Sequence, residues 1–402
     1  MKHLGWALIF FVASAPAWCA KKVSVAQLED LLHSLQQESK SDKDVAGALK
    51  QVELTEELTR AKMNALVHFL PGQRSQEQLY VLEATSANLA PPASDLPAAP
   101  APDEAALQAM LAKAGAYVTA TYEHLPGLSA TRTTLRFQDN EEAVAQSSGL
   151  NGSAKDVVTS SGISATVNDL HFVNSAVAQV ASVHGAEIAP AEKDKTPWGA
   201  NGMIALQEPH PSLAVVYKEA QAAGGLKWLR WEMLNGRQTA VFSFEVPKKE
   251  SHLAINVCCF PNISQAGSAT FYSSTSAPLL AGTGAGGGGA GGVAGTFQTN
   301  TDWHNFKTIT PYRGEFFILP ENGFVLRMIT EAELKSSDLV HQADTRVDYG
   351  QVKVGEKVFM VPIKSIVSTE IAANGDSGAG GYRTRRTLFT SEYRNYRLGG
   401  VQ

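Results

Sequence analysis

The most regular alternation of hydrophobic and polar residues lies between Leu226 and Val246, around the dipeptide Asn235-Gly236. A two-residue type I′ turn needs positive φ at both positions, which Asn and Gly adopt more readily than other residues. The pattern therefore predicts an antiparallel hairpin with this dipeptide at its tip. Its expected register contains the pairs Met233–Gln238, Trp231–Ala240, Leu229–Phe242 and Lys227–Phe244.

One face of this hairpin is predicted to be apolar, because it carries Leu229, Trp231, Phe242 and Phe244. The opposite face is mixed and begins with Trp228. Such alternation is typical of an antiparallel sheet that buries one of its faces. A slip of one residue would exchange the two faces, so the hydrophobic pattern itself supports the register.

Residues 21–90 follow a helical pattern instead. Ser24 and Gln27 form a capping box ahead of leucines at helical spacing. Further helices are expected over 45–52, from about Thr55 to Pro71-Gly72, and after Ser75. Their apolar stripes fit either a partner-binding surface or helices that pack on one another. The second interpretation is favoured, because most surface helices are amphipathic.

Residues 91–102 contain five prolines and four alanines, which predicts an extended, semi-rigid linker. Residues 103–402 are then expected to form an α+β sheet domain, with helices capped by Asp103 and Ser212. Within it, Gly282–Gly295 has nine glycines in fourteen residues and predicts a flexible loop. Strands are expected at 130–137, 157–169, 171–183, 253–260, 312–319, 323–330, 344–354, 357–371 and 382–398.

The composition agrees with a globular protein: of 402 residues, 44% are hydrophobic and 18% are charged. A formal net charge of −5 offers no broad basic field, so nucleic acid is not an expected partner. Residues 1–20 combine the basic Lys2, an apolar run and small residues, which is the pattern of a secretory signal peptide. We therefore expect an exported protein, periplasmic or extracellular, with no transmembrane segment in the mature chain. Cys19 leaves lipidation open, although the bulky Trp18 before it argues against this modification.

Candidate catalytic motifs are incomplete. The segment from Gly375 to Gly378, which contains Ser377, looks like the nucleophile loop of trypsin-like serine proteases, but the histidine base has no counterpart. A turn between two strands is the favoured interpretation. The glycine-rich segment lacks the Gly-Lys-Ser/Thr ending of a phosphate-binding loop. The ten histidines do not show zinc-ligand spacing, so neither a metal nor a cofactor is expected.

Cysteine and tyrosine residues add two weaker signals. Cys258 and Cys259 are adjacent on an expected strand, so their side chains should point to opposite faces. One is expected to be a small buried hydrophobe, and an exposed reactive thiol is the alternative for the other. Near the C-terminus, arginines with Tyr382, Tyr393 and Tyr396 fit either an anion-binding surface or simple alternation on an exposed strand.

Four segments carry a resemblance to known proteins. LSATRTTLRF, WLRWEMLNGRQTAVFSFEVP, YRGEFFILPENGFVLRM and VDYGQVKVGEKVFMVPIKS are similar to segments of a family of uncharacterised exported bacterial proteins. The run of hairpins also looks like the half-barrel of outer-membrane lipoprotein carriers and of periplasmic envelope-stress regulators. This second likeness implies a curved, mainly antiparallel sheet whose concave face holds an acyl chain or an apolar peptide.

We therefore expect a helical N-terminal region followed by a half-barrel-like sheet, and an exported binding or interaction protein rather than an enzyme. Its expected partner is a hydrophobic ligand or an envelope protein. The expected ligand-binding residues are Leu229, Trp231, Phe242 and Phe244, and no catalytic residue is assigned. The alternative is an exported hydrolase whose active site follows no recognised motif.

Overall fold

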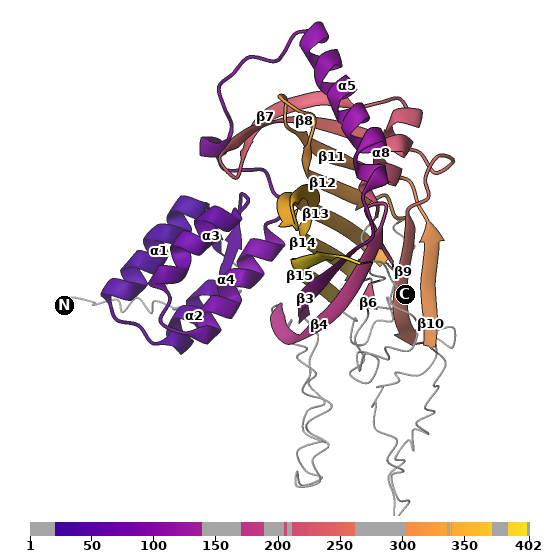
Figure 1. Cartoon of the computed structure of the whole chain (residues 1–402). Helices are drawn as coiled ribbons and strands as arrows, with labels where there is room; N and C mark the ends of the chain where they lie inside the picture. Colours follow the sequence, from indigo (N-terminus) through magenta and orange to yellow (C-terminus); the bar gives the residue numbers. More distant parts are fainter. Residues whose placement is uncertain are drawn as a thin grey trace, which may run out of the picture.

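The chain is an α+β protein in which most helices precede a large antiparallel sheet, as predicted (Figure 1). The computed structural model describes residues 21–138, 170–188, 205–206, 211–261, 303–335, 338, 340–371 and 385–399. The helices are α1 (Val25–Gln37), α2 (Asp42–Lys50), α3 (Arg60–Leu66), α4 (Gln73–Thr85), α5 (Glu104–Ala120) and α8 (Leu213–Ala222). The strands are β1 (Lys21–Val23), β2 (Val52–Leu54), β3 (Leu128–Gln138), β4 (His171–Val183), β5 (Ala186–Ile188), β6 (Ala205–Leu206), β7 (Lys227–Leu234), β8 (Arg237–Val246), β9 (Ala254–Pro261), β10 (Trp303–Ile309), β11 (Tyr312–Ile318), β12 (Val325–Ala332), β13 (Val340–Val354), β14 (Lys357–Ile371) and β15 (Arg385–Leu398).

Ten strands form the main sheet in the order β5-β4-β3-β15-β14-β13-β12-β11-β8-β7, and each neighbouring pair is antiparallel. The sheet ends at β5 on one side and at β7 on the other, so it does not close into a barrel. This open sheet fits the half-barrel-like architecture expected from the sequence. A smaller sheet has the order β10-β9-β6, and β1 pairs in parallel with β2.

The hairpin of β7 and β8 confirms the strongest sequence prediction. Asn235 and Gly236 form its tip, with φ angles of 53° and 75°, as a type I′ turn requires. The predicted pairs Met233–Gln238 and Trp231–Ala240 are both present.

Beyond Trp231 the predicted register is wrong. Trp228, and not Leu229, lies opposite Phe242, and Lys227 lies opposite Ser243. The register shifts at Leu229 because β7 carries one extra residue there, as in a β-bulge. Trp228 is thereby moved onto the face of Trp231, and the two ring centroids lie 4.9 Å apart. A strict period of two cannot anticipate this change of side.

The two faces of the main sheet have different partners. The inner face, which carries Phe242, Phe244 and Phe316, packs against α5 and α8 in the largest hydrophobic cluster. The outer face, which carries Arg327, Arg346 and Lys364, contacts the N-terminal helices. Figure 1 shows α1–α4 on one side of the sheet and α5 with α8 on the other.

The N-terminal helical region encloses a hydrophobic cluster of its own, which includes Leu28, Leu49 and Leu66. The predicted capping box of Ser24 is present at the start of α1. The helix expected over 45–52 lies slightly earlier, because α2 ends at Lys50 and the next residues form β2.

The start of α4 also differs from the prediction. The helix begins at Gln73, and the cap comes from Asp42 of α2. One Asp42 oxygen accepts from the backbone N–H of Arg74 at 3.0 Å, and the other accepts from Ser75 at 2.9 Å. The Ser75 hydroxyl, which donates to Asp42 at 2.6 Å, and these backbone hydrogen bonds hold the pKa of Asp42 below its ordinary value. Since Asp42 is distant in sequence, a local capping pattern misplaces this helix start.

Most of the remaining strands lie within a few residues of their expected bounds. The strand predicted at 130–137 is β3, the one at 171–183 is β4, and the one at 253–260 is β9. The strand expected at 157–169 and the loop Gly282–Gly295 lie outside the described residues.

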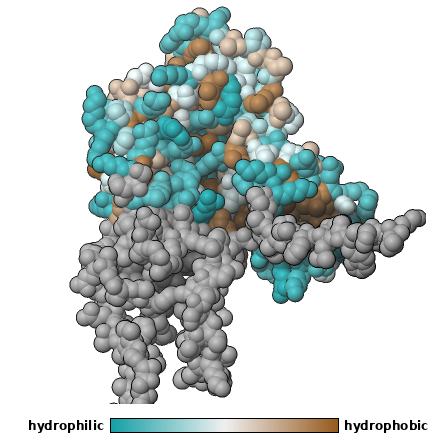
Figure 2. Space-filling view, turned by 180° about the vertical axis from the view of Figure 1, so that it is seen from behind, coloured by the Kyte–Doolittle hydropathy of each residue, from teal (hydrophilic) through white to brown (hydrophobic). Residues whose placement is uncertain are grey.

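Seen from the opposite side, the described surface is mainly hydrophilic, with hydrophobic side chains between the polar ones (Figure 2). The large exposed hydrophobic residues include Val177 on β4, Leu229 on β7 and Val358 on β14. They come from separate strands, and single exposed apolar residues are common on protein surfaces. These three residues therefore do not define a common docking face.

Candidate functional site

The hairpin face expected to bind a ligand is largely occupied by the protein itself. Phe242 and Phe244 are only 1% and 2% exposed, and both belong to the cluster beneath α5 and α8. The Phe244 ring stacks on Phe316 with a centroid distance of 4.7 Å. These two side chains therefore hold the covering helices on the sheet and are not reached by solvent.

The other two expected ligand-binding residues lie at the border of this cluster. Leu229 is 44% exposed because the bulge turns it away from the inner face. Trp231 is half-buried, and its indole N–H donates to the carbonyl oxygen of Pro100 at 2.8 Å. The linker 91–102 thus crosses the hairpin at Trp231.

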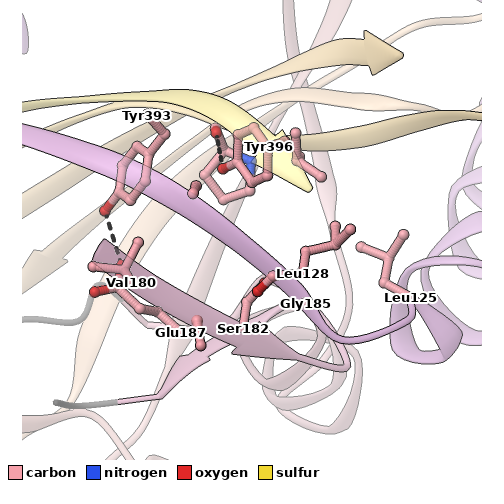
Figure 3. Close-up of a pocket in the computed structure, with 12 residues that line it drawn as sticks. Leu125, Leu128, Val180, Ser182, Gly185, Glu187, Tyr393 and Tyr396 are labelled. Atoms are coloured by element: carbon pink, nitrogen blue, oxygen red, sulfur yellow. Dashed lines mark hydrogen bonds between the residues drawn. The ribbon is translucent and has the colours of Figure 1, made fainter. Parts of the chain in front are cut away.

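A separate pocket lies near the other end of the sheet, beside β3, β4 and β15 (Figure 3). Its cavity is small, about 20 Å³, and opens to solvent. None of the four expected ligand-binding residues lines it. Its walls include Leu125, Leu128, Ala130, Val180, Ser182, Gly185, Glu187, Pro362, Tyr393 and Tyr396.

The floor of the pocket depends on the tight turn between β4 and β5. His184 and Gly185 both have positive φ, at 52° and 71°. The carbonyl oxygen of Gly185 accepts from the Tyr122 hydroxyl at 2.9 Å. A Cβ atom on Gly185 would lie 2.2 Å from the Tyr122 ring, so only glycine fits beneath this aromatic side chain. Tyr122 also contacts Tyr349 of the inner-face cluster, which joins the pocket to the core.

The polar end of the pocket is a single buried carboxylate, Glu187. One of its oxygens accepts from the Arg132 guanidinium at 2.5 Å, and the other accepts from the Tyr393 hydroxyl at 3.1 Å. Burial raises the pKa of Glu187, although Arg132 and the hydroxyl of Tyr393 oppose the rise. Figure 3 shows the Tyr393 hydroxyl directed at this carboxylate.

The remaining polar groups of the pocket are also occupied. The Tyr396 hydroxyl donates to the carbonyl oxygen of Pro362 at 2.5 Å, and Ser182 donates to that of Leu128 at 3.5 Å. Among the lining residues, no serine or cysteine is paired with a histidine base, which nucleophilic catalysis would need. The arrangement is suited to binding an apolar group.

Sequence patterns did not indicate this pocket. Glu187 lies in a short strand within 139–209, where hydrophobic periodicity is weak. The sequence allows an anion-binding surface at Tyr393 and Tyr396, yet Tyr393 is buried against a carboxylate. The only sequence signal for the pocket was the alternation of residues along the two strands. That alternation places Arg132 and Tyr393 on the same buried face only once the pairing of β3 with β15 is known.

The other sequence candidates are not described at the level of side chains. Ser377 lies outside the described residues, and the backbone of Cys258 and Cys259 forms part of β9. Within the part of the chain that the structure describes, no group of His, Cys, Asp and Glu side chains is arranged to hold a metal ion. Within the same ranges, no helix has the length and hydropathy needed to cross a membrane.

Comparison of the chain with protein-family models, with curated proteins and with solved structures finds no match.

Proposed function

We propose that the protein is an exported, non-enzymatic binding protein whose pocket beside β3, β4 and β15 takes an apolar group. The group is the end of an acyl chain or an apolar side chain of a peptide. The observation that carries this proposal is the apolar lining around Val180 and Leu128, whose one carboxylate, Glu187, already has two partners.

The chemistry of the lining supports an uncharged occupant. Both oxygens of Glu187 are engaged, and burying a further charge without a partner would be unfavourable. Apolar walls supply a favourable free energy of roughly 25 cal/mol for each Å² of ligand surface that they remove from water.

The size of the pocket supports only a very small occupant. Its cavity of about 20 Å³ has room for a group about the size of one water molecule, far below the roughly 300 Å³ at the lower limit of ligand pockets. The pocket therefore suits only the tip of a chain or of one side chain, while the rest of the ligand stays outside. The signal-like pattern of residues 1–20 supports export, and an exported protein would meet lipids, lipoproteins or peptides of the cell envelope or the exterior.

Native mass spectrometry of the full protein, purified from the cells that make it, tests this function. We expect a retained lipid or apolar peptide on the wild-type protein and its loss in Val180→Trp, because the indole fills the pocket. Val177→Trp is the matched control, since Val177 lies on the same strand and is 69% exposed. A bound species that persists in a folded Val180→Trp protein would contradict the assignment to this pocket.

A further inference from the structure

The outer face of the sheet is covered by a helical unit that has its own core. Residues 21–90 enclose a cluster built from all four helices and from β1 and β2, with Leu28, Val45 and Met63 among its buried members. The pairing of β1 with β2 joins the start of this unit to the segment between α2 and α3. Its internal packing therefore does not depend on the sheet.

The contact between this unit and the sheet is rich in ion pairs. Glu57 is 3% exposed and accepts from Arg346 at 2.7 Å and from Arg327 at 3.2 Å. Glu83 forms a second buried pair with Lys364. In these pairs the helical unit supplies the carboxylates and the sheet supplies the cations, while Arg60 of α3 pairs with Glu392 of β15 in the opposite sense.

The apolar part of the contact uses mainly small side chains from the helical unit. Val81, Ala84 and Ala87 of the α4 segment pack against the sheet, with Tyr80 half-buried beside them. Their partners on the outer face are Phe137, Ile366 and Leu388, together with the partly buried Leu135, Leu170 and Phe172. Permanent interfaces resemble a hydrophobic core, whereas contacts that open in solution are more polar.

Two of the three cations on the outer face retain a partner without the helices. Asp348 accepts from Arg327 at 2.7 Å and from Arg346 at 3.2 Å. Burial alone would raise the pKa of Asp348, but the two arginines hold it well below its ordinary range. Asp348 thus remains beside both arginines when the helical unit is away, whereas Lys364 loses Glu83 and gains access to water.

The linker 91–102 allows the two parts to separate without breaking the chain. It is anchored to the sheet domain where Pro100 accepts from Trp231, and its short 3₁₀ turn, Ala93–Asp95, also contacts β7. Residues 91–99, this turn included, lie between the Trp231 anchor and the helical unit, and a proline-rich segment spans about 3 Å per residue when extended.

We propose that residues 21–90 undock from the outer face as one folded body, with Glu57 and Glu83 forming the latch. This motion exposes a charged surface on the sheet and leaves the inner-face pocket intact. It is independent of the ligand proposed for that pocket.

Thiol labelling of the full chain distinguishes undocking from unfolding. Ala87→Cys places a thiol in the contact, where Arg346 also donates to the Ala87 carbonyl oxygen at 2.9 Å. Ala46→Cys places one inside the helical unit, where the residue is 6% exposed. The extent of labelling is read from the mass of the peptide that carries each residue. We expect Cys at 87 to react at least tenfold faster than Cys at 46, and equal rates would overturn the proposal.

The latch is tested by adding Glu57→Gln to each reporter variant. The substitution should raise labelling at position 87 about tenfold or more and leave position 46 unchanged. Glu29→Gln is the control, because Glu29 pairs with Lys62 at 2.5 Å inside the helical unit. An equal increase at both positions would show unfolding of the unit and would contradict undocking. If a Glu57 variant does not fold, the labelling rates at positions 87 and 46 without that substitution still test undocking.

Discussion

Phe242 stabilises the fold through its buried ring, which is 1% exposed and lies 5.8 Å from the ring of Trp228. We expect Phe242→Ala to lower the free energy of unfolding by about 3–5 kcal/mol, because it removes buried surface and leaves a cavity under α8. Urea denaturation followed by circular dichroism measures this loss.

Leu229→Ala is the control for Phe242→Ala. Leu229 is 44% exposed at the bulge, so its truncation should change the free energy of unfolding by no more than about 0.5 kcal/mol. If both variants lost the same stability, Leu229 would have to be part of the core and the bulge would be absent.

Asp344 makes a pH-dependent contribution to stability. It is 8% exposed, and burial, with a further contribution from Glu331, raises its pKa from 3.8 to about 6. The folded state therefore holds this proton more tightly than the unfolded chain does. Asp344 contributes stability fully below about pH 4, and this contribution is lost as the pH rises through about 6.

Asp344→Asn should accordingly stabilise the protein at pH 7.5 but not at pH 4. Two pH units of pKa shift correspond to about 3 kcal/mol, which is the upper limit of the expected gain at pH 7.5. Urea denaturation of both proteins at the two pH values gives the difference. A gain that is equal at pH 4 and pH 7.5 would show that the Asp344 carboxyl does not titrate as described.

Individual side-chain partners were the part of the molecule least accessible from the sequence. Glu57 pairs with Arg346 across 289 positions, and Tyr393 pairs with Glu187 across 206. Hydrophobic periodicity reports which side of an element is buried, but it carries no information about which remote residue lies opposite. The candidate pocket could not be predicted for this reason.

At the scale of single elements, the β7–β8 turn depends on the backbone conformation of Gly236. Its φ is 75°, and a Cβ added to it would meet no atom within 4 Å. We expect Gly236→Ala to destabilise the protein by about 1–2 kcal/mol through the left-handed conformation alone.

Gly47→Ala is the counterpart of Gly236→Ala, because here the same substitution should stabilise the protein. Gly47 lies inside α2, and a Cβ there also meets no atom within 4 Å. In a helix interior alanine is favoured over glycine, so the free energy of unfolding should rise by up to about 1 kcal/mol. Thermal or urea denaturation of the two variants should therefore move in opposite directions, and a shift of both in one direction would refute the explanation.

Elements with strong local signals were predictable, and their irregularities were not. The Asn235-Gly236 tip and the capping box of Ser24 follow from chemistry within a few residues. The bulge at Leu229 and the capping of α4 by Asp42 depend on contacts between elements. Each of them changes which residue faces the core or begins a helix.

For the whole molecule, the class and much of the open sheet were predictable because hairpins join strands that follow one another in the chain, as from β11 to β15. The pairings of β3 with β15 and of β8 with β11 join strands that are not consecutive. What covers each face was not. The sequence suggested a free apolar face at Phe242 and Phe244, but α5 and α8 cover it, and these helices are separated by a long stretch of chain. An amphipathic helix packs its apolar side against an apolar surface, but its sequence pattern does not show which surface of the protein that is.

The connection between β9 and β10, residues 262–302, contains the glycine-rich segment Gly282–Gly295, and deleting that segment tests whether the fold needs it. Pro261 and Trp303 lie opposite each other in these antiparallel strands, so pairing of the strands holds the two ends of residues 262–302 together. Deleting Gly282–Gly295 should leave cooperative unfolding intact. The closure entropy changes by only about 0.6 kcal/mol per doubling of loop length, and this deletion removes less than half of the connection. In differential scanning calorimetry, the deletion variant should therefore unfold as cooperatively as the wild-type protein. Loss of cooperative unfolding in the variant would mean that the glycine-rich segment packs against the sheet.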